Sequence, residues 1–333
     1  MKRNQFRRTL AGREVGAIGY GCMGLSQAYG VPPAEEVGEA VLLRALDLGY
    51  DHFDTARIYG QGRNEALVGR ALGRRRDEFL LASKMGIILD DGPRRIDCKP
   101  ETILREADKS LKALNVEHID LYYLHRPDYT VPIEDSMGAM VRLVEQGKIG
   151  AIGLSEMNAE TLRRAHAAHP VAAMQTEYSP FTRNVEIAVL ETARELGTAL
   201  VAFSSVGRGV LSGKVRDMAS LPANDLRQAF PRFKGENFAH NLALVDRFIA
   251  LAEGAGVTGA QLALGWVLAR GDHVHTIPGT TRLDHLEENV ARADWRPDDA
   301  LIAAVDAIFT PDAPAGNRYP EGLRAQVATE EFA

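Results

Sequence analysis

The sequence is poor in cysteine, lacks long hydrophobic runs and carries no large excess of one charge. Its two cysteines, Cys22 and Cys98, are too few for a disulfide framework in 333 residues, which indicates a reducing compartment. No stretch approaches the roughly 18 consecutive apolar residues of a membrane span, and the N-terminal "MKRNQFRRTL" lacks the apolar core of a secretory signal. We therefore expect a cytoplasmic protein with no membrane partner.

The charge distribution and the spacing of histidines argue against two further classes of protein. The net charge is −6, and acidic and basic residues are spread along the chain, so we expect no nucleic-acid partner. Two histidine pairs fall at a predicted helix end and a predicted strand start, and no zinc-type motif occurs, so we expect no metal site. Nothing in the sequence specifies an oligomeric state. The histidine pairs are His166 with His169, and His273 with His275.

What the sequence does contain is a regular alternation of short apolar runs with longer segments of helical spacing. A strand followed by a helix, repeated eight times in about 300 residues, favours a closed α/β barrel of the (β/α)8 TIM type. We expect a single domain that spans residues 1–333. The predicted strands are 16–21, 50–55, 79–84, 118–125, 149–155, 171–177, 198–204 and 273–279, and the clearest predicted helices are 35–48, 101–114, 133–146, 159–169, 185–196 and 283–290.

Three segments depart from this alternation. Residues 6–15, with Ala11 and Gly12 in their middle, predict a β-hairpin ahead of the first barrel strand. Residues 207–238 are rich in glycine, proline and charge, and predict a long functional loop before the last units of the barrel. We expect the irregular tail after Phe309 to fold over one face of the barrel.

The stretch "GYGCMG", residues 19–24, fits the glycine spacing of a dinucleotide-binding turn. Such a turn requires a helix to begin at once, whereas Pro32 and Pro33 follow closely here. We therefore expect this loop to lie beside a substrate pocket instead.

Polar side chains at the ends of predicted strands define a candidate site. In (β/α)8 barrels the chemistry takes place at the carboxyl ends of the strands. Asp54, Lys84 and His125 end three successive predicted strands, and Tyr59 follows the first of these on a short loop. Taken alone, each residue could equally be solvated or have a structural role. All four, however, are predicted at the same rim of the barrel, which favours a functional role.

These four side chains together suggest acid–base chemistry. A phenol has a pKa near 10 and is a poor acid at neutral pH, but a nearby ammonium lowers that pKa. A carboxylate beside the ammonium keeps it charged in a partly buried site. We therefore expect Asp54 to anchor Lys84, Lys84 to lower the pKa of Tyr59, Tyr59 to donate a proton, and His125 to polarise a carbonyl oxygen.

Seven segments together identify a resemblance. They occur in family order with compatible spacing, and they resemble the aldo-keto reductase superfamily from about Val15 to Val290. The sequences of these segments are most similar to those of bacterial and plant NADPH-dependent reductases of small aldehydes, a branch that includes pyridoxal reductases. The segments are "DTARIYGQGRNEALVGRAL", "LASKMG", "DLYYLHRPD", "IGLSEMNAETL", "AMQTEYSPF", "AFSSVGRGVLSGK" and "IPGTTRLDHLEENV".

The resemblance implies that the protein reduces the carbonyl of a small aldehyde or ketone with NADPH, using a catalytic tetrad of Asp54, Tyr59, Lys84 and His125. It also implies a set of cofactor-binding residues. For the nicotinamide these are Phe203, which stacks on the ring, and Ser155 and Gln175, which bind the carboxamide. The pyrophosphate is held by Ser204, Val206, Gly207 and Arg208, and Arg208 supplies the positive charge. The adenosine is surrounded by Gly279, Thr280, Arg282, Glu288 and Asn289, and Arg282 is the cation for the 2′-phosphate.

Glu156 stands where many relatives carry asparagine. An ionised glutamate can accept a hydrogen bond from the carboxamide NH₂ but cannot donate one to its oxygen. We therefore leave Glu156 out of the carboxamide-binding set.

Two other functions remain open. A Schiff-base aldolase would use Lys84 as its nucleophile, but it would leave the segments "SSVGRG" and "GTTRLDHLEEN" without a role. Barrels of this family also serve as cofactor-sensing subunits of potassium channels, which would turn over very slowly. Steady turnover of NADPH with an aldehyde distinguishes all three functions.

The identity of the substrate depends on the walls of the pocket. We expect these walls from residues 22–29, Met85, residues 126–129, the long loop 207–238 and the tail around Tyr319. Two arginines close to the tetrad, Arg57 and Arg126, suggest a substrate with a carboxylate or phosphate. The alternative is that Arg57 points away into a surface ion pair.

Overall fold

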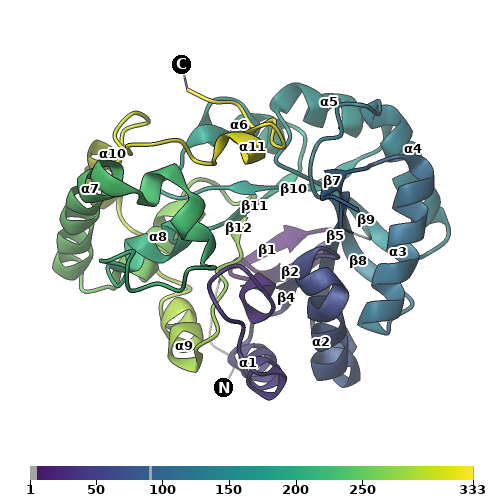
Figure 1. Cartoon of the computed structure of the whole chain (residues 1–333), viewed down its shortest axis with the longest axis horizontal. Coiled ribbons are helices and arrows are strands. Elements are labelled where there is room, and N and C mark those ends of the chain that lie inside the picture. The colour runs from purple at the N-terminus through teal and green to yellow at the C-terminus, as the bar shows by residue number, and fades with distance from the viewer. Residues whose placement is uncertain (1–5, 90–91, 333) are drawn as a thin grey trace.

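Eight parallel strands form the centre of the structure, as the sequence predicted (Figure 1). The computed structural model describes residues 6–89 and 92–332. The strands pair in the order β3-β4-β5-β8-β9-β10-β11-β12, and a parallel bridge from Ile18 to Thr276 closes the barrel. Their bounds are β3 Tyr20–Gly21, β4 His52–Asp54, β5 Leu80–Met85, β8 Ile119–Leu124, β9 Ile149–Ser155, β10 Val171–Glu177, β11 Ala199–Phe203 and β12 Val274–Thr276.

The barrel closes most tightly where the chain after β12 passes β3. A Cβ atom on Gly21 would lie 2.6 Å from the carbonyl oxygen of Ile277, and one on Gly279 would lie 2.7 Å from the carbonyl oxygen of Gly21. Because neither side has room for a side chain, both positions require glycine. This contact places Gly279 and the residues after it at the mouth of the barrel.

Helices surround the strands, as Figure 1 shows. The predicted helices are present, although the one expected at 185–196 begins only at Val189, after a 3-10 turn at Asn184–Glu186. In the described part of the chain no single helix is long and apolar enough to cross a membrane; only α7 and α8 together reach that length and composition, across an 87° bend. The helices are α1 Glu35–Leu48, α2 Arg63–Leu72, α3 Pro100–Leu114, α4 Ile133–Glu145, α5 Ala159–Ala168, α6 Val189–Glu195, α7 Gly235–Gly254, α8 Gly259–Leu268, α9 Leu283–Ala291, α10 Asp299–Ile308 and α11 Glu321–Arg324.

The α8 helix lacks a periodic sequence signal for a physical reason. Every residue of Gly259–Leu268 except Gln261 is buried, so no polar face alternates with an apolar one. Its start is still marked locally, because Thr258 and Gln261 form a capping box.

The predicted N-terminal hairpin is present as β1 (Arg7–Leu10) and β2 (Arg13–Gly16). Its apolar residues Leu10 and Val15 belong to the same buried cluster as Leu80, Leu121 and Val201 of the barrel strands. A barrel interior must be filled by side chains, so the hairpin completes the core.

The predicted long loop contains only short 3-10 turns, η5 (Gly207–Ser212), η6 (Leu226–Ala229) and η7 (Pro231–Phe233), before α7 begins. A further antiparallel pair, β6 (Ile87–Ile88) and β7 (Arg95–Ile96), follows β5. The C-terminal tail crosses the barrel beside these loops, as the yellow ribbon in Figure 1 shows.

A buried ion pair fastens the tail to the barrel. Glu156, directly after β9, accepts hydrogen bonds from Nη1 and Nη2 of Arg318 at 3.1 and 2.7 Å. Its side chain also accepts from Thr329 Oγ1 at 2.8 Å and from the backbone N–H of Glu177 at 3.0 Å. Burial alone would raise the pKa of Glu156, but Arg318 and then Arg126 more than offset it, so the pKa lies below its ordinary value. Glu156 is therefore ionised and structural.

We predict that Glu156→Gln destabilises the fold by about 3–5 kcal/mol, because it leaves the Arg318 guanidinium buried without a carboxylate. Denaturant unfolding at neutral pH measures this loss. Since the folded pKa is depressed, the contribution of Glu156 is fully present above the unfolded-state pKa of about 4.3 and is lost as the pH falls through the folded value. The difference in the free energy of unfolding between the variant and the wild type should therefore become smaller at acidic pH.

The matched control is Glu134→Gln, which removes an exposed partner of Arg164 and should cost far less. Equal losses for the two variants would contradict the structural role of the buried pair. The double variant Glu156→Gln, Arg318→Met should recover part of the loss.

Candidate active site

The structure brings the four predicted catalytic side chains together at the carboxyl ends of β4, β5 and β8. All four are buried. Nζ of Lys84 donates to Oδ1 of Asp54 and to the carbonyl oxygen of Thr55 at 2.7 Å. The same Nζ lies 3.5 Å from the hydroxyl oxygen of Tyr59, whose ring meets the His125 ring edge-on at a centroid distance of 5.9 Å. One ammonium is thus shared by a carboxylate and a phenol.

The electrostatics of this group differ in part from the sequence-based expectation. Burial alone would lower the pKa of Lys84, but Asp54 and Tyr59 more than compensate, so its pKa is raised and the ammonium stays charged. Burial raises the pKa of Tyr59 above its ordinary value, and Lys84 only opposes this rise. The expected lowering by Lys84 is present as a contribution, but the net direction was wrong because desolvation dominates. Tyr59 is therefore protonated at neutral pH.

His125 is held as a neutral imidazole. Burial lowers its pKa well below the ordinary value, and the cations Arg126, Lys84 and Arg94 lower it further. Within residues 6–89 and 92–332, its buried Nδ1 atom has no hydrogen-bond partner. A neutral imidazole can donate one hydrogen bond to a carbonyl oxygen, but it is a poor proton source here. Of the two groups, the protonated phenol of Tyr59 has the proton available to donate.

Gln175, expected to bind a carboxamide, also takes part in the catalytic cluster. Its Nε2 donates to Oδ2 of Asp54 at 2.8 Å, the oxygen that Lys84 does not use. Both oxygens of the buried carboxylate are therefore bonded, which fixes its orientation.

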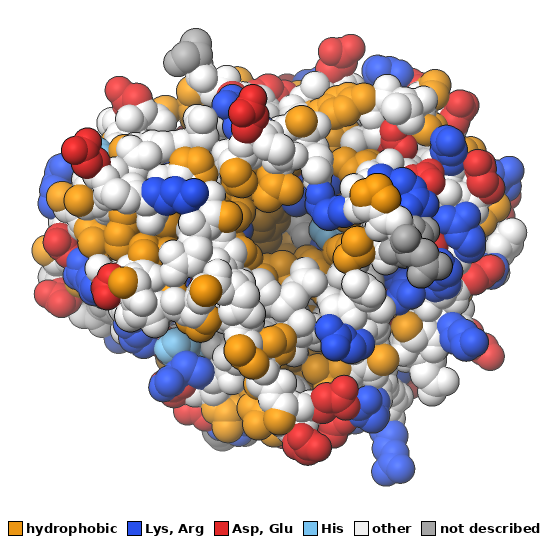
Figure 2. Space-filling model, in the orientation of Figure 1, with side chains coloured by type: hydrophobic (Ala, Val, Ile, Leu, Met, Phe, Trp, Pro, Cys, Tyr) orange, Lys and Arg blue, Asp and Glu red, His pale blue; other side chains and the backbone are white. Residues whose placement is uncertain are grey.

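One cavity of about 540 Å³ joins the catalytic cluster to the segment after β12. Figure 2 shows its mouth as a hollow near the centre of the face. Among the predicted site residues, Lys84 and Gly207 do not line it, and both are buried. The predicted residues that do line it are Asp54, Tyr59, His125, Ser155, Gln175, Phe203, Ser204, Val206, Arg208, Gly279, Thr280, Arg282, Glu288 and Asn289.

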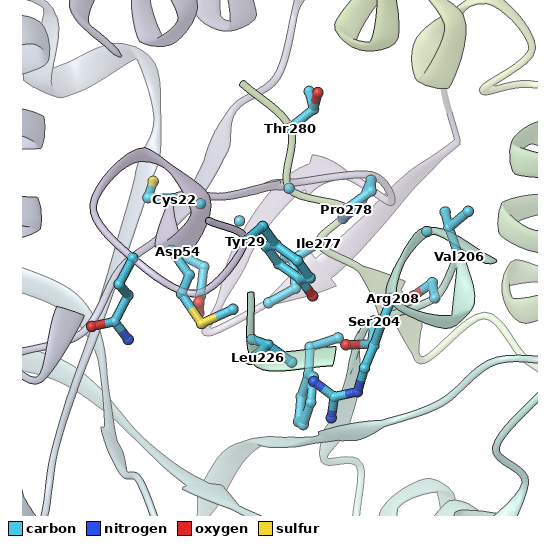
Figure 3. Close-up of a pocket in the computed structure, with 18 of the residues that line it drawn as sticks. Cys22, Tyr29, Asp54, Ser204, Val206, Arg208, Leu226, Ile277, Pro278 and Thr280 are labelled. Atoms are coloured by element: carbon cyan, nitrogen blue, oxygen red, sulfur yellow. The ribbon is translucent and has the colours of Figure 1, made fainter. Parts of the chain in front are cut away.

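Two loops meet across this cavity. In Figure 3, Cys22 and Asp54 lie on one side, Ser204, Val206 and Arg208 on the other, and the ring of Tyr29 between them. Tyr29 forms a β-bridge with Asp225, and the N–H of Leu226 donates to the carbonyl oxygen of Ala28 at 2.8 Å. The glycine-rich loop that follows β3 thus borders the pocket, as expected. The sequence placed both segments in the pocket wall, but it did not indicate their direct contact, because no local pattern marks a contact between segments so far apart.

Arg208, which we expect to supply charge to a pyrophosphate, forms a buried ion pair in this structure. Its Nη2 donates to Oε2 of Glu177 at 2.6 Å, and its guanidinium lies 4.4 Å from the centroid of the Phe230 ring. Burial alone would lower the pKa of Arg208, but Glu177 raises it above the ordinary value. Arg208 lines the cavity with its charge compensated by Glu177, and its contact with a pyrophosphate stays a prediction.

The far end of the cavity carries cations that the sequence analysis only partly identified. Arg282 is exposed and forms a bidentate ion pair with Asp284, at 3.0 and 2.7 Å. Lys214 also lines this end, with its Nζ 3.2 Å from Nε2 of His285 and 3.5 Å from a carboxylate oxygen of Glu288. Lys214 ends the segment "AFSSVGRGVLSGK", which carries the family resemblance. Its positive charge there is the sequence signal that could have identified it.

Several expected pocket residues lie elsewhere. Arg57 does not line the cavity, because its guanidinium lies 3.5 Å from Glu65 and 3.7 Å from Glu106. Arg57 thus points away from the cavity into ion pairs, as the alternative interpretation expected, but its partners Glu65 and Glu106 are buried and not at the surface. This position does not support its suggested role in selecting substrates. Met85 and Tyr129 also fall outside the cavity lining, whereas Arg126 and Tyr319 belong to it.

No metal-binding cluster occurs in the described ranges, where no group of three or more His, Cys, Asp or Glu residues is placed to hold an ion. The histidines have structural contacts instead. Nδ1 of His166 accepts from the backbone N–H of Val171 at 3.3 Å, and Nε2 of His275 lies 3.2 Å from the carbonyl oxygen of Thr9 in the hairpin.

Comparison with known proteins agrees with this geometry. Residues 17–309 match the sequence profile described as the Aldo/keto reductase family. The chain belongs to this family.

Curated relatives and solved structures cover nearly the whole chain of this aldo/keto reductase. It is 42% identical over 315 residues to a probable aldo-keto reductase 1 of Glycine max, covering 94% of this chain and 90% of the relative. It is 40% identical over 327 residues to the aldo-keto reductase yakc [NADP(+)] of Schizosaccharomyces pombe, covering 96% of each. The structure of the glycerol dehydrogenase AKR11B4 from Gluconobacter oxydans superimposes with a TM-score of 0.83 at 29% identity, covering 95% of this chain and 98% of that one.

We predict that Lys84→Met lowers kcat/KM for carbonyl reduction by about a hundredfold or more, the range expected for loss of acid catalysis. Without the ammonium, the largest of the contributions that oppose the burial-raised pKa of Tyr59 is lost, so proton donation becomes less favourable. Steady-state rates from pH 6 to 10 measure this, and a cofactor-binding titration shows whether the site is intact.

The matched control is Lys148→Met, which removes an ammonium from an exposed ion pair with Asp108. That variant should keep the wild-type rate and pH profile. A Lys84→Met enzyme with a near-normal rate and an unshifted profile would show that Lys84 does not act on Tyr59.

Proposed function

We propose that this protein reduces the carbonyl group of small aldehydes or ketones to alcohols with NADPH, and that Tyr59 donates the proton. The observation that carries this proposal is the buried ammonium of Lys84, which bonds Asp54 and lies 3.5 Å from the hydroxyl oxygen of Tyr59 at one end of a cavity. A neutral phenol placed beside a fixed cation is suited to give up its proton to an oxygen that gains negative charge.

The chain's own residues fit a nicotinamide dinucleotide. The cavity has polar groups for a carboxamide at Ser155 and Gln175, a flat apolar ring at Phe203, and exposed cations at its other end. The name of the yeast relative, which specifies NADP(+), supports the phosphorylated form. When bound, this cofactor supplies the hydride.

The remaining steps belong to the protein. His125 donates a hydrogen bond to the carbonyl oxygen and orients it towards Tyr59. Tyr59 transfers its phenolic proton to that oxygen, and the phenolate is stabilised by Lys84, which Asp54 keeps charged. Gln175 holds the second oxygen of Asp54 in place.

The competing functions are less well supported by this geometry. An aldolase needs a neutral Lys84, whereas its ammonium donates to Asp54 and Thr55 and has a raised pKa. A slow cofactor sensor would share the cavity but not the turnover. The finer resemblance to pyridoxal reductases adds pyridoxal to the substrates that we would assay, beside methylglyoxal and 4-nitrobenzaldehyde.

Replacing Tyr59 tests the reaction directly. Wild-type protein should oxidise NADPH steadily with at least one of these aldehydes, and Tyr59→Phe should lower kcat by about 10²–10⁴ while cofactor binding persists, because only the proton donor is lost. Initial rates and a fluorescence titration with NADPH measure both quantities. Half of the activity remaining in Tyr59→Phe would sink the assignment, and no turnover in wild type would favour the sensor.

Replacing Arg282 tests the cofactor preference. Arg282→Ala should raise KM for NADPH about tenfold more than KM for NADH, because a charge-assisted contact to the 2′-phosphate is lost. The matched control is Arg296→Ala, which removes a similar exposed ion pair with Asp272 away from the cavity. Equal effects of Arg282→Ala on both cofactors would show that this residue does not read the phosphate.

A further inference from the structure

We propose that Arg94 and Arg126 form an oxyanion-binding subsite beside the catalytic cluster, which selects carbonyl substrates that also carry a carboxylate or a phosphate. The inference rests on the proposed reductase function, because the bound molecule is taken to be its substrate. Both arginines line the same cavity as Tyr59 and His125.

Arg126 is fixed at the wall next to the reacting group. It directly follows His125, and its Nη1 donates to the carbonyl oxygen of His125 at 2.6 Å and to Oγ of Ser155 at 3.3 Å. Both of these acceptors are uncharged. The carboxylate of Glu156 also acts on Arg126, but it is already bonded in a bidentate pair to Arg318. The remaining N–H groups of Arg126 are available to a ligand.

Arg94 reaches the cavity from a different part of the chain. It lies in the loop that ends at β7, and its Nη1 donates to the side-chain oxygen of Gln326 in the C-terminal tail. This partner is also uncharged. Figure 2 shows Lys and Arg side chains beside the central hollow, on the side where a histidine is visible.

The charges of other arginines at this rim are compensated, in contrast to these two. Arg208 pairs with Glu177, Arg318 with Glu156, and Arg227 with Asp225. Within residues 6–89 and 92–332, no ion pair joins a carboxylate to Arg94 or Arg126.

Arg94 and Arg126, which form no ion pair within the described residues, also lie close enough to affect one another. Burial lowers the pKa of Arg94, and Arg126 lowers it further; both arginines lower the pKa of His125. A bound oxyanion would relieve this repulsion, and two planar guanidinium groups match the oxygens of a carboxylate or phosphate. Because both arginines line the same cavity as Tyr59 and His125, one substrate can present its carbonyl to Tyr59 and His125 and its anionic group to the arginines.

A pair of aldehydes that differ only in charge tests the proposal. The pair is 4-carboxybenzaldehyde and its methyl ester, methyl 4-formylbenzoate, assayed with NADPH at low ionic strength. Wild type should favour the acid in kcat/KM, and Arg94→Gln and Arg126→Gln should each lower the acid-to-ester ratio by about three- to tenfold or more, since charge-assisted hydrogen bonds are lost. A second pair, glyceraldehyde 3-phosphate and glyceraldehyde, shows whether phosphate is preferred to carboxylate.

The matched control is Arg95→Gln, the neighbouring arginine, which is exposed and lies outside the cavity lining. It should leave both ratios unchanged. A wild-type ratio that does not favour the anion, or a preference that survives in Arg94→Gln and Arg126→Gln, overturns the subsite.

A calorimetric measurement separates this inference from the proposed function. With NADP⁺ bound, the enzyme cannot reduce an aldehyde. Separate titrations of this complex with 4-carboxybenzaldehyde and with its methyl ester therefore compare binding alone. The subsite is supported if the acid binds more tightly than the ester and both variants lose this difference in affinity. If the acid binds in this way but no turnover occurs, only the reductase proposal fails. Turnover of the ester without any arginine-dependent preference leaves the reductase proposal intact and overturns the subsite.

Discussion

The buried ion pair of Lys84 and Asp54 is the constraint on which the site depends. An isolated ammonium in this position would cost several kcal/mol or lose its proton, so the carboxylate must be present and correctly oriented. Parallel pairing supplies it, because β4 and β5 run side by side and end at the same rim. Tyr59 then faces the third side of the ammonium, and Gln175 bonds the free oxygen of the carboxylate. A change in either strand would misplace all of these groups together.

The charged side chains at the rim around this pair are of two kinds, those in buried ion pairs and the cations at the two ends of the cavity. The pairs of Glu156 with Arg318 and of Glu177 with Arg208 are buried, and they hold the tail and the long loop against the barrel. The cations at the two ends of the cavity are different. Arg282 has only an exposed partner, a kind of pair that contributes little and can exchange for a phosphate. The cavity thus carries cations at both ends, with an apolar and neutral centre at Phe203 and His125.

The sequence predicted the parts of the site that local patterns carry. Strand ends identified Asp54, Lys84 and His125, because the carboxyl ends of parallel strands must converge. The patterns failed where burial removes periodicity, as in α8, and where the partner is distant along the chain. Glu156 is the clearest case: its role depends on Arg318, 162 positions away. The pKa of Tyr59 could not be predicted either, since the cost of burial depends on packing that the sequence does not show.

The order of residues by itself determined the closed barrel, the family and the identity of the four catalytic candidates. Alternating apolar periods select strands and helices, and a right-handed strand–helix repeat leaves few other arrangements. Only the tertiary structure decided which charges are free. Arg57, Arg94, Arg126 and Arg208 look alike in the sequence. Among the residues that the structure describes, Arg57 and Arg208 form ion pairs with carboxylates, whereas Arg94 and Arg126 donate to uncharged oxygens. Charge compensation depends on distances between segments that fold together, and those distances are set by packing rather than by local sequence.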